Sequence, residues 1–171
     1  MIIDSHSIPE GEIIEIDVCI VGAGVAGITV AQKFIGDRIR VGLFECGDLK
    51  PDNETQSFFW GKNIVHPYYP LDMTRSCGFG GSAHRWNIDL QTGNFGVRLH
   101  PLDAIDFIER EWVPNSGWPF DKSHLDFFYE RAQRVCKIGP YAYDAEDWEG
   151  TKQTPSLPFK SNRVKKTIFQ F

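Results

Sequence analysis

The sequence predicts an α/β fold with a doubly wound, parallel β-sheet and a helical insertion in its second half. Three observations support this prediction: an apolar strand-like run near the N-terminus, a glycine-rich turn leading into a helical pattern, and a second apolar run. Together they predict a strand–helix–strand unit over residues 12–47. The two strands of such a unit are almost always parallel, with a right-handed crossover between them.

Each element of this unit has its own signal. The first strand is expected within EIIEIDVCIVG, whose nearly continuous apolar run is typical of a central strand buried on both faces. The helix is expected within GAGVAGITVAQKFIG, because apolar residues recur there at helical spacing and Gly36 offers a stop. The second strand is expected from about Arg40 to Glu45.

The rest of the chain divides into three segments. Residues 48–100 show little periodicity, and an irregular segment of that length inside a compact domain is usually functional. Residues 101–139 contain two helical patterns, from about Pro101 to Trp112 and from about Lys122 to Lys137. Residues 140–171 are expected to form a linker and then the start of another strand.

Composition excludes several classes of protein. The chain has 171 residues and a formal net charge of −5, which gives no general attraction to nucleic acid or to anionic membrane surfaces. It contains no apolar run of about 18 residues, so no membrane span is expected. Its four cysteines form no CxxC pair and its five histidines no HxH or HExxH motif, so no metal site is expected. Because the N-terminus lacks the features of a secretory signal, we expect a reducing cytoplasm.

The strongest motif is Gly22-x-Gly24-x-x-Gly27, between the expected strand and helix. Gly22 allows a tight turn, Gly24 lets the backbone approach a pyrophosphate, and Gly27 allows close packing of helix and strand. Val25, next to Gly24, belongs to the same candidate site. Glu45 ends the second strand, where a carboxylate accepts hydrogen bonds from ribose hydroxyls and repels a 2′-phosphate. The motif predicts binding of FAD or NAD rather than NADP. The alternative is a glycine-rich turn without a nucleotide.

A second glycine cluster lies in the irregular segment. Adjacent Gly80 and Gly81 can point successive N–H groups into one anion-binding concavity, and Ser82 adds a hydroxyl. Arg75 can neutralise a phosphate, and the indole of Trp86 can lie against a flavin ring. The alternative is a flexible turn beside a buried tryptophan. A long segment with a second glycine cluster suits a two-part cofactor, so we favour FAD over NAD.

Three stretches, in order, resemble the glucose-methanol-choline (GMC) oxidoreductases: DVCIVGAGVAG, LFECG and RSCGFGGSAHRWN. The later stretch WPFDKSHLDFFYERAQRVCKIG is also similar to a family segment, and the branch that resembles the chain most includes pyranose oxidases and gluconate-dehydrogenase-like proteins. The resemblance implies an FAD-type Rossmann domain in an enzyme that oxidises CH–OH groups of sugars or alcohols. It implies that the first glycines hold the FAD pyrophosphate and Glu45 the adenosine ribose. The 80–82 cluster would then pass along the pyrophosphate and flavin.

The chain departs from the family pattern in three places. Ala83 replaces the second serine of the family's GGSS motif. Arg85 stands where some relatives carry the histidine that bonds covalently to flavin, while His84 lies one position earlier, so we expect non-covalent FAD. The third departure is length, because relatives are several times longer and carry their catalytic pair near the C-terminus.

The length difference leads us to expect an N-terminal FAD-binding part without its substrate domain, and the sequence identifies no catalytic residue. Three alternatives remain open. The chain is a non-catalytic remnant, or one subunit of a split enzyme with a C-terminal partner chain, or an NAD-binding module of another dehydrogenase.

Overall fold

The computed structural model describes residues 1–50, 52–89, 95–150, 155, 158–159 and 164–171. They form a mixed α/β structure with a small two-stranded parallel sheet and several helices. The chain divides into two compact units, Met1–Trp86 and Asn87–Phe171. The boundary between the units falls within the irregular segment expected over residues 48–100.

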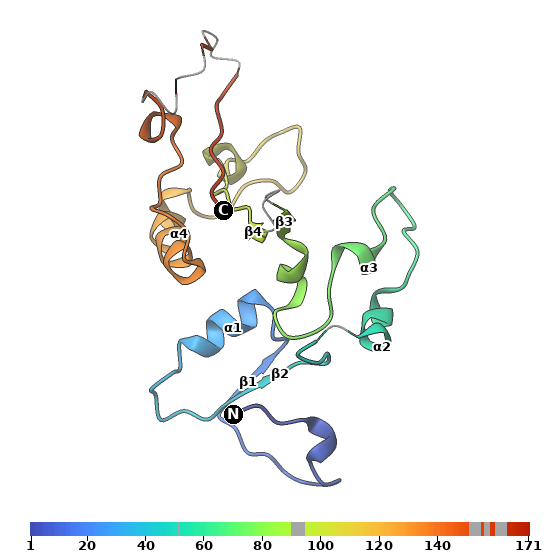
Figure 1. Cartoon of the computed structure of the whole chain (residues 1–171). Helices are drawn as coiled ribbons and strands as arrows, with labels where there is room; N and C mark the ends of the chain where they lie inside the picture. The colour runs from blue at the N-terminus through green and yellow to red at the C-terminus, as the bar shows by residue number, and fades with distance from the viewer. Residues whose placement is uncertain (51, 90–94, 151–154, 156–157, 160–163) are drawn as a thin grey trace. The chain divides into compact units, whose positions relative to one another are not determined.

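The first unit contains the predicted strand–helix–strand. Strand β1 (Val18–Val21) pairs in parallel with β2 (Val41–Phe44), and helix α1 (Val25–Gln32) connects them and lies against both (Figure 1). Val18 is the partner of Val41, and Val21 is the partner of Phe44. The predicted order of these elements and the parallel pairing are therefore confirmed.

The sheet is covered less completely than its apolar sequence indicates. Side chains of β1 alternate between half-buried and exposed, and Ile20 lies on the face that α1 covers. Val21 points to the other face and is 84% exposed, while Phe44 of β2 is 45% exposed. The expectation that β1 is buried on both faces is wrong for the described residues, because α1 covers only one face.

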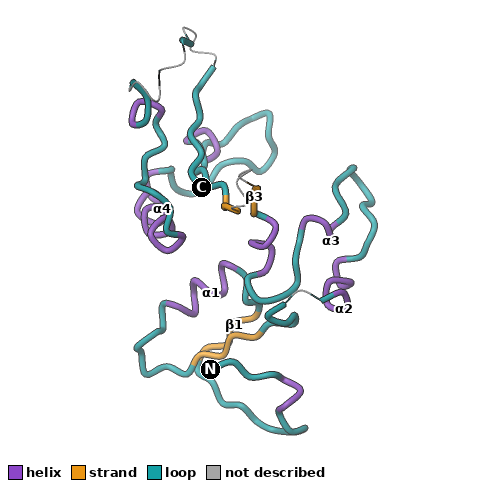
Figure 2. Tube along the Cα trace, viewed as in Figure 1, coloured by secondary structure: helices purple, strands orange, loops and turns teal. Residues whose placement is uncertain are grey.

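The rest of the first unit consists of short helical turns joined by loops (Figure 2). They are η1 (Ser5–Ser7), α2 (Asn53–Gln56), η2 (Ser57–Phe59), α3 (Leu71–Thr74) and η3 (Gly81–Arg85). Gln56, at the end of α2, links this helix to the segment around α3 by three hydrogen bonds. Its side-chain amide donates to the carbonyls of Asp72 and Arg75, at 2.9 and 2.8 Å, and its Oε1 accepts from the N–H of Cys77 at 3.1 Å.

The second unit is built around helix α4 (Ser123–Cys136). It also contains an antiparallel pair, β3 (Asn87–Asp89) with β4 (Phe95–Val97), and the turns η4 (Ala104–Phe107) and η5 (Ala145–Asp147). Helix α4 confirms the helix predicted over 122–137. The helix is followed by its C-cap Lys137, which takes up a left-handed conformation with φ of 56°.

The prediction of a helix from Pro101 to Trp112 is wrong. Only the short turn η4 forms, because tertiary hydrogen bonds take the backbone groups that a longer helix would use. The N–H of Trp118 donates to the carbonyl of Phe107 at 3.1 Å. The hydroxyl of Ser116 accepts from the N–H of Arg110 at 2.8 Å and donates to its carbonyl at 3.1 Å.

The strand expected near the C-terminus is reduced to one isolated antiparallel bridge between Leu99 and Gln170. The two residues exchange backbone hydrogen bonds of 3.0 and 3.2 Å. Within the described part of the chain, the buried apolar side chains include Ala23, Cys77, Pro101 and Phe107. No helix there is both long enough and apolar enough to cross a membrane.

Candidate functional site

The first glycine motif forms the turn from β1 into α1. Gly22 has φ of +95°, a left-handed conformation that side-chain-bearing residues rarely adopt, and its N–H donates to the carbonyl of Phe44 at 2.7 Å. A Cβ on Gly27 would lie 2.0 Å from the carbonyl oxygen of Gly22. Only glycine therefore allows α1 to pack this closely on the turn, as the motif predicts.

Gly24 is the N-cap of α1 and has space in front of it. A Cβ built there meets no protein atom within 4 Å, and the backbone has an ordinary extended conformation. Helix packing therefore does not explain the glycine at this position. The open space fits the role predicted for it, which is to let a ligand approach the helix N-terminus, where N–H groups and the helix dipole favour an anion.

The structure brings the second glycine cluster against the first. The N–H of Gly80 donates to the carbonyl of Ala23 at 2.8 Å, and Gly24 and Gly80 form a parallel bridge. A Cβ on Gly81 would lie 3.0 Å from the Cα of Gly24. Gly80 and Gly81 both have positive φ, at 95° and 56°. The N–H of Gly81 donates to the carbonyl of Gly78 at 2.8 Å, so both glycine N–H groups are used within the fold and the anion-binding concavity predicted for them is wrong. Two motifs more than fifty residues apart in sequence thus form one glycine-lined surface.

Glu45 lies at the end of β2, where its carboxylate contacts the first glycine turn. Its Oε2 accepts a hydrogen bond of 2.7 Å from the N–H of Ala23, and its Oε1 accepts one of 3.1 Å from the N–H of Gly47. Partial burial raises the pKa of Glu45, but these backbone hydrogen bonds outweigh it and leave the pKa below its usual value. Glu45 is therefore a carboxylate at neutral pH.

The other predicted site residues have less clear roles in the structure. The Ser82 hydroxyl accepts a long hydrogen bond of 3.4 Å from the N–H of Ser76, so Ser82 contributes to the fold of this turn. The side chains of Val25, Arg75 and Trp86 are exposed. Val25 is the first residue of α1, and Trp86 follows η3. The structure shows no contact that assigns these three side chains a binding role.

Arg85, rather than Arg75, holds the second cluster in place. Its Nε donates to the hydroxyl of Ser76 at 2.9 Å, and its Nη2 donates to the carbonyl of Asp72 at 3.0 Å. His84 folds back over the turn, where its Nε2 donates to the carbonyl of Phe79 at 2.8 Å. Neither structural role was predictable from the sequence, because the partners of both side chains lie in an irregular segment without periodicity.

A pair of thiols adjoins Glu45. The Sγ atoms of Cys46 and Cys77 are 3.0 Å apart, and the ligand atoms of Glu45, Cys46 and Cys77 lie within 4.8 Å of one another. This grouping is one that could hold a metal ion, although no metal site was expected. The two cysteines are 31 positions apart in the sequence, so spacing gave no signal for their proximity.

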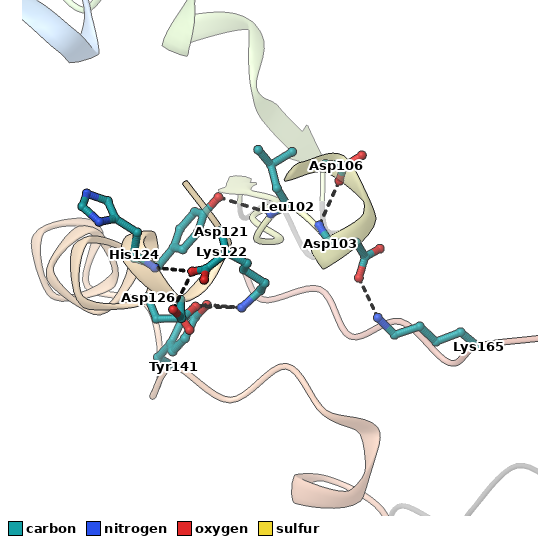
Figure 3. A network of polar contacts seen from close by, with 11 residues as sticks. Leu102, Asp103, Asp106, Asp121, Lys122, His124, Asp126, Tyr141 and Lys165 are labelled. Atoms are coloured by element: carbon teal, nitrogen blue, oxygen red, sulfur yellow. Dashed lines mark hydrogen bonds and ion pairs between the residues drawn. The ribbon is translucent and has the colours of Figure 1, made fainter. Parts of the chain in front are cut away.

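The second unit contains a separate polar cluster, shown in Figure 3. Lys122 Nζ donates to Asp126 Oδ1 at 2.7 Å and to the Tyr141 hydroxyl at 3.2 Å, while that hydroxyl donates to Asp126 at 2.8 Å. Burial, followed by the hydrogen bond to Asp126, raises the pKa of Tyr141, although Lys122 opposes the shift. The Tyr141 phenol therefore stays protonated at neutral pH. The cluster ties the start of α4 to the loop that follows the helix.

Comparisons with protein-family models, with curated proteins and with solved structures found no match for this chain. The resemblance to the GMC oxidoreductases is therefore one of sequence motifs alone.

Proposed function

We propose that the chain binds FAD non-covalently, as the N-terminal cofactor-binding part of an FAD-type Rossmann oxidoreductase that acts on CH–OH groups of sugars or alcohols. The observation that carries the proposal is the contact between the two glycine motifs at the N-terminus of α1. A helix N-terminus lined by glycine backbone, with a carboxylate at the end of the next strand, is the arrangement that dinucleotides require.

The residues present fit such a cofactor. The open space at Gly24 leaves room for a pyrophosphate beside the first amides of α1. Glu45 uses part of its hydrogen-bonding capacity on the N–H groups of Ala23 and Gly47. A carboxylate offers about four lone-pair sites, so it can still accept hydrogen bonds from ribose hydroxyls. Its negative charge disfavours a 2′-phosphate at the same place, and this favours FAD or NAD over NADP.

The second glycine cluster favours FAD over NAD. Gly80 and Gly81 extend the site beyond the first turn and line it with glycine backbone, although their own N–H groups donate to the carbonyls of Ala23 and Gly78 and form no anion nest. FAD is the larger of the two cofactors and makes use of contacts beyond the first glycine turn. When bound, a flavin supplies an acceptor for the hydride of a CH–OH group. The substrate class rests on the GMC resemblance alone.

One observation favours a second candidate function, that of a subunit in a split enzyme. The face of the parallel sheet that carries Val21 is exposed, and parallel sheets are normally covered on both faces. A C-terminal partner chain that supplies the substrate domain would cover this face. Such a chain would still bind FAD at the same glycine motifs, so both candidates predict the same cofactor.

A matched pair of variants tests FAD binding. Gly24 and Gly61 both have open space where a Cβ would lie, and neither has positive φ, but only Gly24 lies at the proposed pyrophosphate site. We expect the full chain to bind FAD in preference to NAD and NADP, measured by calorimetric titration. Gly24→Ala should weaken FAD binding at least about tenfold and Gly61→Ala should leave it unchanged. Tighter binding of NAD, or equal FAD affinity in both variants, would refute the proposal.

A further inference from the structure

Two segments that carry the glycine site also bring a pair of cysteines together. Cys46 directly follows Glu45 at the end of β2, and Cys77 directly precedes Gly78 in the second cluster. The Cys46 and Cys77 Sγ atoms are 3.0 Å apart. Their backbones also meet, because the N–H of Phe79 donates to the carbonyl of Asp48 at 3.2 Å and a Cβ on Gly47 would lie 2.6 Å from the Cα of Gly78.

We propose that Cys46 and Cys77 are a reversible oxidation site, at which a disulfide bond joins the end of β2 to the second glycine cluster. The thiols already lie side by side, so the bond requires their sulfur atoms to approach by about 1 Å, to the usual S–S length of about 2.05 Å. Cys46 is exposed and open to an oxidant, whereas Cys77 is buried and positioned to complete the bond. The inference does not depend on FAD binding.

The geometry favours a disulfide over a metal ion. Two thiolates that bind zinc tetrahedrally, with Zn–S bonds of about 2.3 Å, hold their sulfur atoms about 3.8 Å apart. The observed separation of 3.0 Å is shorter than that. The nearest third ligand is Glu45, and both of its oxygens already accept backbone hydrogen bonds, from Ala23 and Gly47. A metal ion would have to move the thiols apart.

A low-molecular-weight disulfide such as glutathione disulfide is a sufficient oxidant. The Cys46 thiolate attacks one sulfur of the reagent, whose S–S bond breaks and releases one glutathione thiolate. The Cys77 thiolate then attacks the Cys46 sulfur of the mixed disulfide and releases the second glutathione. The two protein thiols lose two electrons and two protons, and the glutathione disulfide becomes two molecules of glutathione.

Oxidation of this pair is expected to be slow near neutral pH. The hydrogen bond with Cys77, together with burial, raises the pKa of Cys46 to about 11, so this thiol is almost entirely protonated. Once formed, the bond fixes the strand end that carries Glu45 against the turn that carries Gly80. The oxidised chain should therefore unfold at a temperature about 5–10 °C higher than the reduced chain.

The test uses the full chain with Cys19→Ser and Cys136→Ser, which removes the two other thiols, both exposed. Because oxidation is slow near neutral pH, this variant is incubated overnight with glutathione disulfide at mildly alkaline pH and analysed by intact mass and peptide mapping. We expect a loss of about 2 Da, a crosslinked peptide pair containing Cys46 and Cys77, and recovery of both thiols with dithiothreitol. In the same background, Cys77→Ser should stop at a glutathione adduct of about 305 Da on Cys46.

The peptide map of the double-serine background decides the outcome even if the Cys77→Ser variant does not fold. Two thiols that stay free after incubation would overturn the proposal, as would a stable glutathione adduct on Cys46 in the presence of Cys77. A parallel incubation with zinc chloride tests the competing interpretation. One zinc ion bound per chain through both thiols, with no crosslink under glutathione disulfide, would identify a metal site in place of the disulfide.

Discussion

The backbone N–H of Ala23 donates a 2.7 Å hydrogen bond to Oε2 of Glu45, a residue 22 positions further along the chain. This bond joins the first glycine turn to the end of β2, and the carbonyl of the same Ala23 accepts the N–H of Gly80. Ala23 is 1% exposed. One small residue between two motif glycines therefore connects all three parts of the candidate site.

Replacing Glu45 should weaken FAD binding. Hydrogen bonds from ribose hydroxyls to a charged carboxylate contribute about 1.5–3 kcal/mol each. Glu45→Ala is therefore expected to reduce FAD affinity roughly ten- to a hundredfold, measured by titration with flavin fluorescence. Glu54→Ala is a suitable control, because this glutamate lies on the separate helix α2. Unchanged FAD affinity in Glu45→Ala would mean that the carboxylate serves only the turn.

Glu45 should also make stability depend on pH. Its pKa in the folded chain lies below the usual glutamate value of 4.5, although burial opposes this shift. A depressed pKa gives stability that is present above the unfolded value and is lost as the pH falls through the folded one. We expect the thermal midpoint to fall as the pH drops below about 4.5, and to fall less in Glu45→Gln. Equal pH dependence in both proteins would show that other carboxylates dominate.

Two glycine substitutions in the same motif should differ in how much unfolding free energy they cost. A Cβ at position 27 would lie 2.0 Å from the Gly22 carbonyl oxygen, so Gly27→Ala must displace α1 and should cost about 2–4 kcal/mol of unfolding free energy. Gly24→Ala meets no protein atom within 4 Å and should cost at most about 1 kcal/mol. Urea denaturation followed by circular dichroism measures both values. Similar losses in the two variants would contradict the close packing at Gly27.

Phe107 should contribute strongly to the stability of the second unit. It is 6% exposed, and its ring lies 6.0 and 6.2 Å from the rings of Trp118 and Phe120, measured between centroids. Phe107→Ala is expected to destabilise the unit by about 3–4 kcal/mol and to alter tryptophan fluorescence. Ile105→Ala is the matched control on the same turn, because Ile105 is exposed and should change stability by less than about 1 kcal/mol.

Asp126 should control the ionisation of Tyr141. After burial, the Asp126 hydrogen bond is the largest cause that raises the pKa of this tyrosine, while Lys122 lowers it. Asp126→Asn is therefore expected to lower the pKa of Tyr141, whereas Lys122→Met should raise it. Ultraviolet titration of phenolate absorbance, with Tyr141→Phe subtracted, measures the shift. A shift in the same direction for both variants would contradict the observed network.

Local patterns predicted several elements correctly. The apolar runs and the glycine motif predicted β1, α1 and β2 in their order, and apolar spacing predicted α4 nearly to its ends. They failed between Pro101 and Trp112, where the helical pattern is real but Ser116 and Trp118 take the backbone groups the helix would need. Ser116 and Trp118 lie beyond the end of the expected helix, so the apolar periodicity within that segment gives no sign of these hydrogen bonds.

By itself, the sequence determined the chemistry available at the glycine turn: the flexible backbone at Gly22 and Gly24, and a carboxylate at the end of the next strand. It also indicated that Gly27 permits close packing. Only the tertiary structure decided that Gly80 meets Ala23, that Arg85 holds the second cluster, and that Cys46 meets Cys77. The spacing of residues along the sequence predicts contacts only within one helix or strand. These contacts instead join segments that are separated by long irregular loops. The geometry of these contacts depends on how the loops fold, which no local sequence pattern specifies.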